Sequence, residues 1–207
     1  IIAGGTRSIS RQGLASISRI ALNSIAGNYG DAAIAAMSVV TRIGMFIFSV
    51  IIGLGQGFQP MCGFCYGAKL YDRVKEGFWF STKIGTVFLL FWSVVLIIFS
   101  EEAVALFRND PDVIAIGIKA LRYQMIVFPA CSFMMMANMM METCRMTIRA
   151  NILAASHHGM FLIPLIIILA HYFGLLGVEI CQAVSDLISL VVTIPIVWTA
   201  LREMNMA

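Results

Sequence analysis

Residues 43–68 form one uninterrupted stretch without a charged side chain, and this stretch limits the fold more than any other feature of the sequence. A helix needs about 20 predominantly apolar residues to cross a bilayer, so the stretch is long enough to span a membrane. The whole chain agrees, because 60% of its residues are hydrophobic, 12% are charged and its mean hydropathy is +0.90. Soluble domains are about 45–50% apolar and about 25% charged. The sequence therefore predicts a polytopic membrane protein.

Further apolar stretches of similar length follow one another along the chain. They predict an all-α fold, a bundle of six transmembrane helices that forms a single transmembrane domain over residues 1–207. Residues 109–111 (Asn-Asp-Pro) predict the start of a helix, because Asn and Asp cap helices and proline is tolerated at the first helical position. The expected helices cover residues 8–28, 33–57, 78–100, 113–141, 152–172 and 175–201.

Basic side chains are distributed unevenly between the links that join these helices. One set of links and both ends of the chain carry nine basic residues, whereas the opposite links carry Arg108 beside several acidic residues. Lys and Arg concentrate in the cytoplasmic loops of membrane proteins. The pattern predicts a multi-pass protein of the cell (plasma or inner) membrane with both ends in the cytoplasm. The nine residues are Arg7, Arg11, Lys69, Arg73, Lys75, Lys83, Arg145, Arg149 and Arg202.

The residues that would indicate an enzyme or a metalloprotein follow no recognised pattern. Cys62 and Cys65 have the Cys-x-x-Cys spacing, but no second pair accompanies them, so we expect no metal site. The sequence shows no nucleophile motif and no phosphate-binding loop. It also has no basic patch with interleaved aromatic residues. We therefore expect neither an enzyme nor a bound cofactor, and no nucleic-acid partner.

Glycine, glutamine and proline concentrate in residues 53–68, the second part of the uncharged stretch. Pro60 removes the hydrogen bond that its N–H would have made one turn back, so we expect a kink at residues 57–60. Such a helix suits close packing beside a polar path, with Gln56 and Gln59 in the path. The alternative is a packing seam from which the glutamines snorkel. Both interpretations stay open.

Two charged residues lie far from either end of their expected helices. Charges at bilayer depth cost about 2.5–3.5 kcal/mol each to insert, and by default they are functional candidates that face the bundle interior. Arg42 would face a cavity or form a structural pair between helices. Asp186 would carry a proton or act as a hydrogen-bonded structural residue, and Gln182 lies one turn before it on the same face. Gln12 and Asn23 are further polar candidates inside the membrane.

Methionines dominate residues 134–141. Methionine adapts its shape and suits promiscuous apolar surfaces. The run covers almost two helical turns, so packing against lipid or neighbouring helices explains most of it. Met134, Met135 and Asn138 are candidates for lining a pocket.

Gly53-Leu-Gly-Gln-Gly-Phe-Gln-Pro60 and the segment 63–69 resemble the second helix of the C-terminal lobe in MATE (multidrug and toxic compound extrusion) transporters. Five further segments, in the right order, resemble the seventh, eighth, tenth and eleventh helices of the family and the turn after the eleventh. The bacterial multidrug branch, which includes DNA-damage-inducible members, is the most similar. The five segments are residues 11–18, 29–37, 106–111, 163–165 and 173–177.

The resemblance implies one lobe of a two-lobe transporter, in which the lobes face each other across a central cleft. It implies secondary active multidrug efflux, with cationic or amphiphilic compounds exported in exchange for protons or sodium. The implied partners are the lipid bilayer, the N-terminal lobe of the same transporter, and a small-molecule drug or toxin. Some branches carry acidic ion ligands at positions that are apolar here, near Ala15 and Met134, so the coupling-ion site is expected in the N-terminal lobe. The cleft candidates are Arg42, Gln56, Gln59, Pro60, Met134, Met135 and Asn138.

Two other functions fit parts of the sequence. A lipid-linked sugar flippase of the same superfamily would need a strongly cationic cleft for pyrophosphate, which the few intramembrane arginines supply only in part. A non-transporting membrane subunit would need six helices that are stable and complete alone. The chain begins with Ile1 rather than Met, and we expect this to be a cut end rather than a natural start.

Overall fold

The computed structural model describes most of the chain, namely residues 30–108, 110–156 and 161–206, together with Ile20, Ser24 and Gly27. These residues are almost entirely helical, and no strand occurs among them. Among the described residues, four helices are long and apolar enough to cross a membrane, and a shorter fifth one is also apolar. The prediction of an all-α membrane protein is confirmed. The helices are α2 (Asp31–Gly67), α3 (Tyr71–Ile98), α4 (Ser100–Ala105), α5 (Pro111–Thr143), α6 (Thr147–Ala155), α7 (Leu162–Phe173) and α8 (Leu175–Met206).

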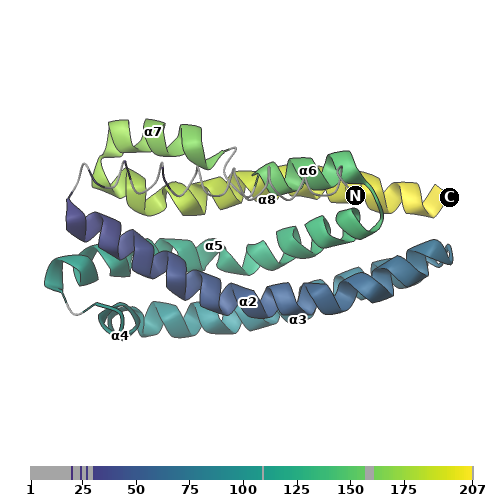
Figure 1. The fold of residues 1–207 in the computed structure, drawn as a ribbon, viewed down its shortest axis with the longest axis horizontal. Helices are drawn as coiled ribbons and strands as arrows, with labels where there is room; N and C mark the ends of the chain where they lie inside the picture. The colour runs from purple at the N-terminus through teal and green to yellow at the C-terminus, as the bar shows by residue number, and fades with distance from the viewer. Residues whose placement is uncertain are drawn as a thin grey trace.

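The expected helix 33–57 extends further in the structure. α2 continues through Pro60 and ends at Gly67. A proline removes one backbone hydrogen bond, but it often bends a membrane helix rather than ending it, because neighbouring helices hold both halves. Figure 1 shows that α2 changes direction along its length. The glycine-rich segment therefore belongs to the helix and not to the link that follows it.

The expected helix 78–100 starts earlier, because the charged residues before the apolar stretch are helical as well. Arg73 and Glu76 form an exposed ion pair of 3.3 Å, and Lys75 and Asp72 form another of 3.4 Å. Residues three positions apart are neighbours on a helix surface, so both pairs suit a helical turn outside the apolar region. Hydropathy thus marks where this helix enters the membrane and not where it begins.

Within the expected helix 152–172 the structure describes two helices, and residues 157–160 between them lie outside the described residues. α6 ends at Ala155 and α7 begins at Leu162. Pro164 lies in the first turn of α7, where a missing backbone N–H is tolerated, whereas inside a continuous helix it would remove a hydrogen bond. The proline therefore suits the start of a new helix.

The remaining expected helices agree with the structure where it describes them. Helices 113–141 and 175–201 correspond to α5 and α8. Asp110 caps α5 as predicted, because its side chain accepts a hydrogen bond of 3.2 Å from the backbone N–H of Asp112. Most of the expected helix 8–28 lies outside the described residues.

α5 lies at the centre of the described bundle. It packs against the long helices α2, α3 and α8, and against the short helices α4 and α6. Figure 1 shows the four long helices running lengthwise beside one another. Each of them buries apolar side chains against α5, so a single core runs along the molecule.

The two ends of the bundle differ in charge. Figure 1 places the α2–α3 link, the α5–α6 link and the C-terminus at one end, and the α4–α5 link and the α7–α8 turn at the other. The first, which we call the basic end, carries Lys69, Arg145 and Arg202. The second, the acidic end, carries Arg108 beside four acidic residues. These are Glu101, Glu102, Asp110 and Asp112.

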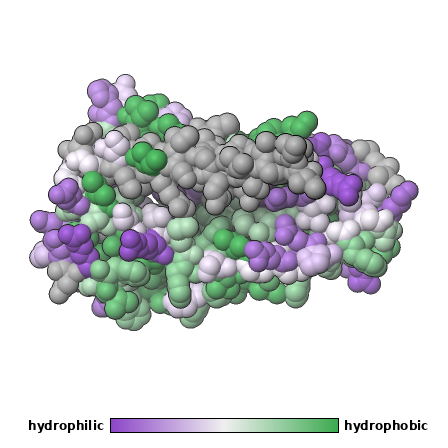
Figure 2. Space-filling view, in the orientation of Figure 1, coloured by the Kyte–Doolittle hydropathy of each residue, from purple (hydrophilic) through white to green (hydrophobic). Residues whose placement is uncertain are grey.

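Between these ends, the outer side of α3 is apolar. Phe80, Val87, Phe91 and Ile98 are among its exposed side chains. Figure 2 shows hydrophobic residues gathered along the lower edge of the molecule, where Figure 1 places α3, and hydrophilic residues concentrated toward the two ends. Apart from the exposed Lys83, this surface is apolar and suits contact with acyl chains.

Candidate functional site

α2 presents one open face that differs from the apolar surface of α3. Its residues recur every three or four positions, which places them on one side of a helix. Arg42, Gln56 and Pro60 lie on this face, whereas Gln59 is half-buried beside it. All members of the open face are exposed. They are Arg42, Phe46, Ser49, Gly53, Gln56, Gly57, Pro60 and Phe64.

The chemistry of the open face argues against contact with lipid. Arg42 lies within the apolar part of α2, where a guanidinium costs about 2.5–3.5 kcal/mol to insert if it faces the bilayer. Gln56 adds a polar amide to the same face. The outer side of α3, by contrast, has no charged residue from Ile84 to Ile98. The open face therefore fits a wall that meets water or another polar surface.

The glycines of α2 are divided between its open and its packed side. A Cβ atom at Gly55 would collide with the side chain of Met139 on α5. Nothing lies within 4 Å of a Cβ atom built at Gly53 or Gly57. Gly55 therefore lets α2 approach α5 closely, whereas Gly53 and Gly57 lie where no other described atom is near.

The methionine run belongs mainly to the core of the lobe. Met134 is 4% exposed, Met136, Met140 and Met141 are fully buried, and Met135 is half-buried. Asn138 is 8% exposed, and its Oδ1 atom has no hydrogen-bond partner among the described residues. Packing therefore accounts for most of the run, and the structure does not bring these residues onto the open face of α2.

A second group of polar residues is buried on α8. Asp186 is 5% exposed, and the thiol of Cys131 on α5 lies 3.9 Å from its Oδ2 atom. Gln182 is half-buried one turn earlier. Glu179 is 3% exposed, and its Oε2 atom has no hydrogen-bond partner in the described part of the chain. The sequence analysis missed Glu179, although its spacing from Gln182 and Asp186 already placed it on their face.

The structure does not place the other residues singled out in the sequence on the open face of α2 or among the buried polar residues of α8. Cys62 does not face Cys65, because its Sγ atom lies 3.9 Å from that of Cys144. Within residues 30–108, 110–156 and 161–206 no group of three or more His, Cys, Asp or Glu side chains could hold a metal ion. Gln12 and Asn23 lie outside the described residues.

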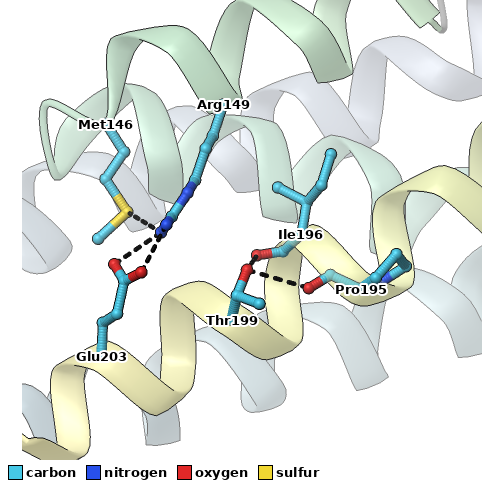
Figure 3. Close-up of polar contacts among 6 residues, drawn as sticks. All are labelled: Met146, Arg149, Pro195, Ile196, Thr199 and Glu203. Atoms are coloured by element: carbon cyan, nitrogen blue, oxygen red, sulfur yellow. Dashed lines mark hydrogen bonds and ion pairs between the residues drawn. The ribbon is translucent and has the colours of Figure 1, made fainter.

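An ion pair fastens α6 to α8 at the basic end. Arg149 donates hydrogen bonds of 2.8 and 2.5 Å to the two carboxylate oxygens of Glu203, and a weaker one of 3.8 Å to the sulfur of Met146 (Figure 3). The carboxylate raises the pKa of the Arg149 guanidinium above its ordinary value, so this arginine stays charged. The sequence analysis did not foresee this pair, because its members are 54 positions apart.

Comparisons with known proteins place this arrangement of helices in one family. The MatE family model matches residues 9–168, which is most of the chain. The chain belongs to the MatE family. The resemblance inferred from the sequence is thereby confirmed, and MatE proteins are membrane transporters, including proteins of multidrug efflux.

Two curated MatE relatives show how much of such a protein this chain represents. It is 24% identical over 188 residues to the probable multidrug resistance protein YoeA of Bacillus subtilis (strain 168), covering 86% of this chain and 39% of that protein. It is 24% identical over 168 residues to the multidrug export protein MepA of Staphylococcus haemolyticus (strain JCSC1435), covering 80% of this chain and 36% of that protein. The chain thus spans less than half the length of these relatives.

Solved MATE structures match the fold of almost the entire chain. A multidrug resistance MATE transporter in its inward-facing conformation gives a TM-score of 0.90 at 21% identity, covering 98% of this chain and 48% of that one. The outward-facing conformation also gives 0.90 at 21% identity, covering 98% and 46%. The Vibrio cholerae MATE transporter VcmN in its bent form gives 0.89 at 21% identity, covering 97% and 46%. The MatE lobe therefore has the same fold as its counterpart in both conformations.

Proposed function

We propose that this chain is the C-terminal lobe of a secondary active transporter that exports cationic or amphiphilic compounds in exchange for protons or sodium. Membership of the MatE family supports this proposal, together with two relatives whose names specify multidrug resistance and multidrug export. The chain spans less than half of each relative, so its partner in this proposal is the N-terminal lobe of the same transporter. The coupling-ion site is proposed to lie in that lobe.

The open face of α2 is the observation that carries this proposal. Arg42 on this face would pair with a carboxylate of the opposite lobe, because a guanidinium binds a carboxylate through two parallel hydrogen bonds. Phe46 and Phe64 are 79% and 76% exposed on the same face. Aromatic faces attract cations and also offer apolar area, which suits amphiphilic cations. Together these residues would form one wall of the cleft.

The similarity to two solved conformations supports a simple mode of action. A fold that matches the inward- and the outward-facing structure equally well suits a lobe that moves as a rigid body. Alternating access would then arise from rocking of the two lobes around the cleft. The basic end would lie in the cytoplasm, because Lys and Arg concentrate on that side, and both chain ends would lie there too. The membrane would be the cell membrane.

Replacement of Arg42 tests the proposed cleft wall. In the full-length protein, Arg42→Ala should reduce export of the cationic dye ethidium several-fold. The variant lacks the guanidinium that would pair with a carboxylate of the opposite lobe. Dye export is measured as the fluorescence decrease in loaded cells of a drug-sensitive bacterial strain, at equal amounts of transporter in the membrane. Arg73→Ala is the matched control, because Arg73 is exposed at the start of α3 and pairs with Glu76. Export at the wild-type rate by Arg42→Ala would contradict the proposed wall.

A further inference from the structure

α8 carries polar residues on its inner side and large apolar residues on its outer side. Five polar residues follow one another at intervals of three and four positions, and at about 100° per residue they fall within an arc of about 80°. Leu187, Val191 and Trp198 are exposed on the other side. The five residues extend over about 21 Å, at about 1.5 Å per residue. We call them the polar stripe of α8: Glu179, Gln182, Asp186, Ser189 and Thr193.

The hydroxyl groups of the polar stripe have a structural explanation. Ser189 donates a hydrogen bond of 2.9 Å to the backbone carbonyl oxygen of Ser156, at the end of α6. Thr193 donates one of 2.7 Å to the carbonyl oxygen of Ser189. Small hydroxyl side chains commonly join membrane helices in this way. Ser189 therefore joins α8 to the end of α6, and the hydroxyl of Thr193 is satisfied within α8 itself.

Packing does not explain Glu179 in the same way. Its side chain is buried, its Oε2 atom has no hydrogen-bond partner, and it takes part in none of the ion pairs among the described residues. A buried ionised carboxylate without such partners is costly, because it loses its hydration shell and forms no hydrogen bond at Oε2 and no ion pair in return. A carboxyl group that has bound a proton carries no charge and avoids most of this cost. A proton is therefore the ligand that this position accommodates best.

No described basic side chain near the polar stripe forms an ion pair with Glu179, so Glu179 is the candidate for binding a proton. Lys119 on α5 acts on Glu179 electrostatically, but it is exposed and does not form an ion pair with it. Arg122 on α5 donates to Ser100 instead, 3.0 Å away. Charged and titratable groups occur on every helix that packs against α8, and on α8 itself. They are Tyr71, Asp72, Arg73, Lys75, Glu76 and Lys83 on α3, Asp112, Lys119, Arg122, Tyr123, Cys131 and Glu142 on α5, Arg149 on α6, His171 and Tyr172 on α7, and Cys181, Asp186, Arg202 and Glu203 on α8.

We propose that Glu179 is a proton-binding residue of this lobe, in addition to the coupling site expected in the N-terminal lobe. The residue lies in the second turn of α8, close to the acidic end, so a proton would reach it from that end past Lys119. Binding forms one O–H bond on the carboxylate and changes no other bond. Protonation would favour the closed α5–α8 contact, whereas the anion would favour access of water to this position. Its use in transport rests on the proposed function, but the binding itself does not.

Labelling with dicyclohexylcarbodiimide tests the proposal without any transport measurement. This apolar carbodiimide adds to a protonated carboxyl group in apolar surroundings and forms a stable N-acylurea, which mass spectrometry locates on a peptide. In the full-length protein purified in detergent, we expect labelling of Glu179 that decreases severalfold as the pH is raised. Glu179→Gln should remove this label. Glu203→Gln, which changes an exposed glutamate of the same helix, should leave it unchanged.

Three results would overturn the proposal. The first is no label on Glu179 in a protein that elutes as a single species. The second is labelling of Glu179 that does not vary with pH. The third is protection of Glu179 from labelling by sodium chloride but not by choline chloride. The last result would identify a sodium site instead. Glu179→Asp guards against a folding defect, because it keeps the carboxyl group and should retain the pH dependence of labelling. Labelling without dye export would leave the proton site intact and count against the proposed transport function alone.

Discussion

At the scale of single residues, two glutamates of α8 show how position decides the role of a side chain. Glu203 is half-exposed at the basic end, and Arg149 binds both of its carboxylate oxygens. Glu179 is buried near the acidic end and has an oxygen without a hydrogen-bond partner among the described residues. A cation stabilises the charge of the first carboxylate. The second has no such partner, and this difference leads to the proposed proton site.

The ion pair at the basic end should contribute modestly to stability. Arg149→Ala is expected to lower the thermal unfolding temperature of the purified full-length protein only slightly, because exposed ion pairs are weakened by solvent and salt. Glu203→Ala should have a similar effect, and the double variant should unfold at nearly the same temperature as either single variant. Each single change already removes the interaction, so the effects should not add. Additive effects in the thermal shift assay would show that the two residues do not act as a unit.

At the scale of helices, close contacts at glycines hold the lobe together. A Cβ atom at Gly177 on α8 would collide with the backbone carbonyl oxygen of Leu169 on α7. Gly174, in the turn just before it, has a φ of 60°, a conformation that favours glycine. The two glycines thus permit the tight α7–α8 turn. A backbone atom cannot move aside as a flexible side chain can, so this contact tolerates a methyl group less well than that of Gly55 with Met139.

Three glycine substitutions test this ranking. Gly177→Ala should destabilise the protein by about 1–3 kcal/mol, because overpacking forces the backbone to shift. Gly55→Ala should cost less, since Met139 can adopt another rotamer. Gly53→Ala should cost nothing, because nothing lies within 4 Å of the added carbon. Thermal unfolding of the three purified variants would check the order. Equal unfolding temperatures for Gly177→Ala and Gly53→Ala would be inconsistent with the close α7–α8 contact.

At the scale of the whole molecule, the lobe is expected to act as one body. The fold matches the inward- and the outward-facing structure with the same TM-score of 0.90. The central helix α5 contacts nearly every other described helix. A displacement on one side of the lobe would therefore move the other side with it. Covalent cross-links within the lobe should therefore not impede transport, whereas cross-links between the two lobes should.

The thiols of Cys62 and Cys144 allow this expectation to be tested. They join α2 to the α5–α6 link, and their sulfur atoms lie 3.9 Å apart, so a small approach would permit a disulfide of about 2.05 Å. Oxidation with copper phenanthroline should form this bond, detected by mass spectrometry, and dye export by the full-length protein should continue at its previous rate. Cys62→Ser should prevent the bond and serves as the control. A loss of export that depends on both cysteines would mean that the lobe changes its internal packing during transport.

Several helix boundaries differ from the sequence prediction for physical reasons. Hydropathy located the apolar part of α3 but not the turn before it, because charged residues that form exposed i,i+3 ion pairs lower the hydropathy of that turn although Val74 is buried there. Pro60 was expected to kink α2 and lies inside the helix, which continues beyond it.

The amino-acid sequence by itself determined the membrane fold, the charge difference between the two ends and the resemblance to MATE transporters. These properties depend on local composition or on helical periodicity, so no knowledge of packing is needed. The tertiary structure alone decided that the methionine run is core, that Cys62 faces Cys144 and that the Oε2 atom of Glu179 is buried without a hydrogen-bond partner among the described residues. Such facts depend on which sides of distant helices meet, and this is set by the packing of side chains that are far apart in the sequence.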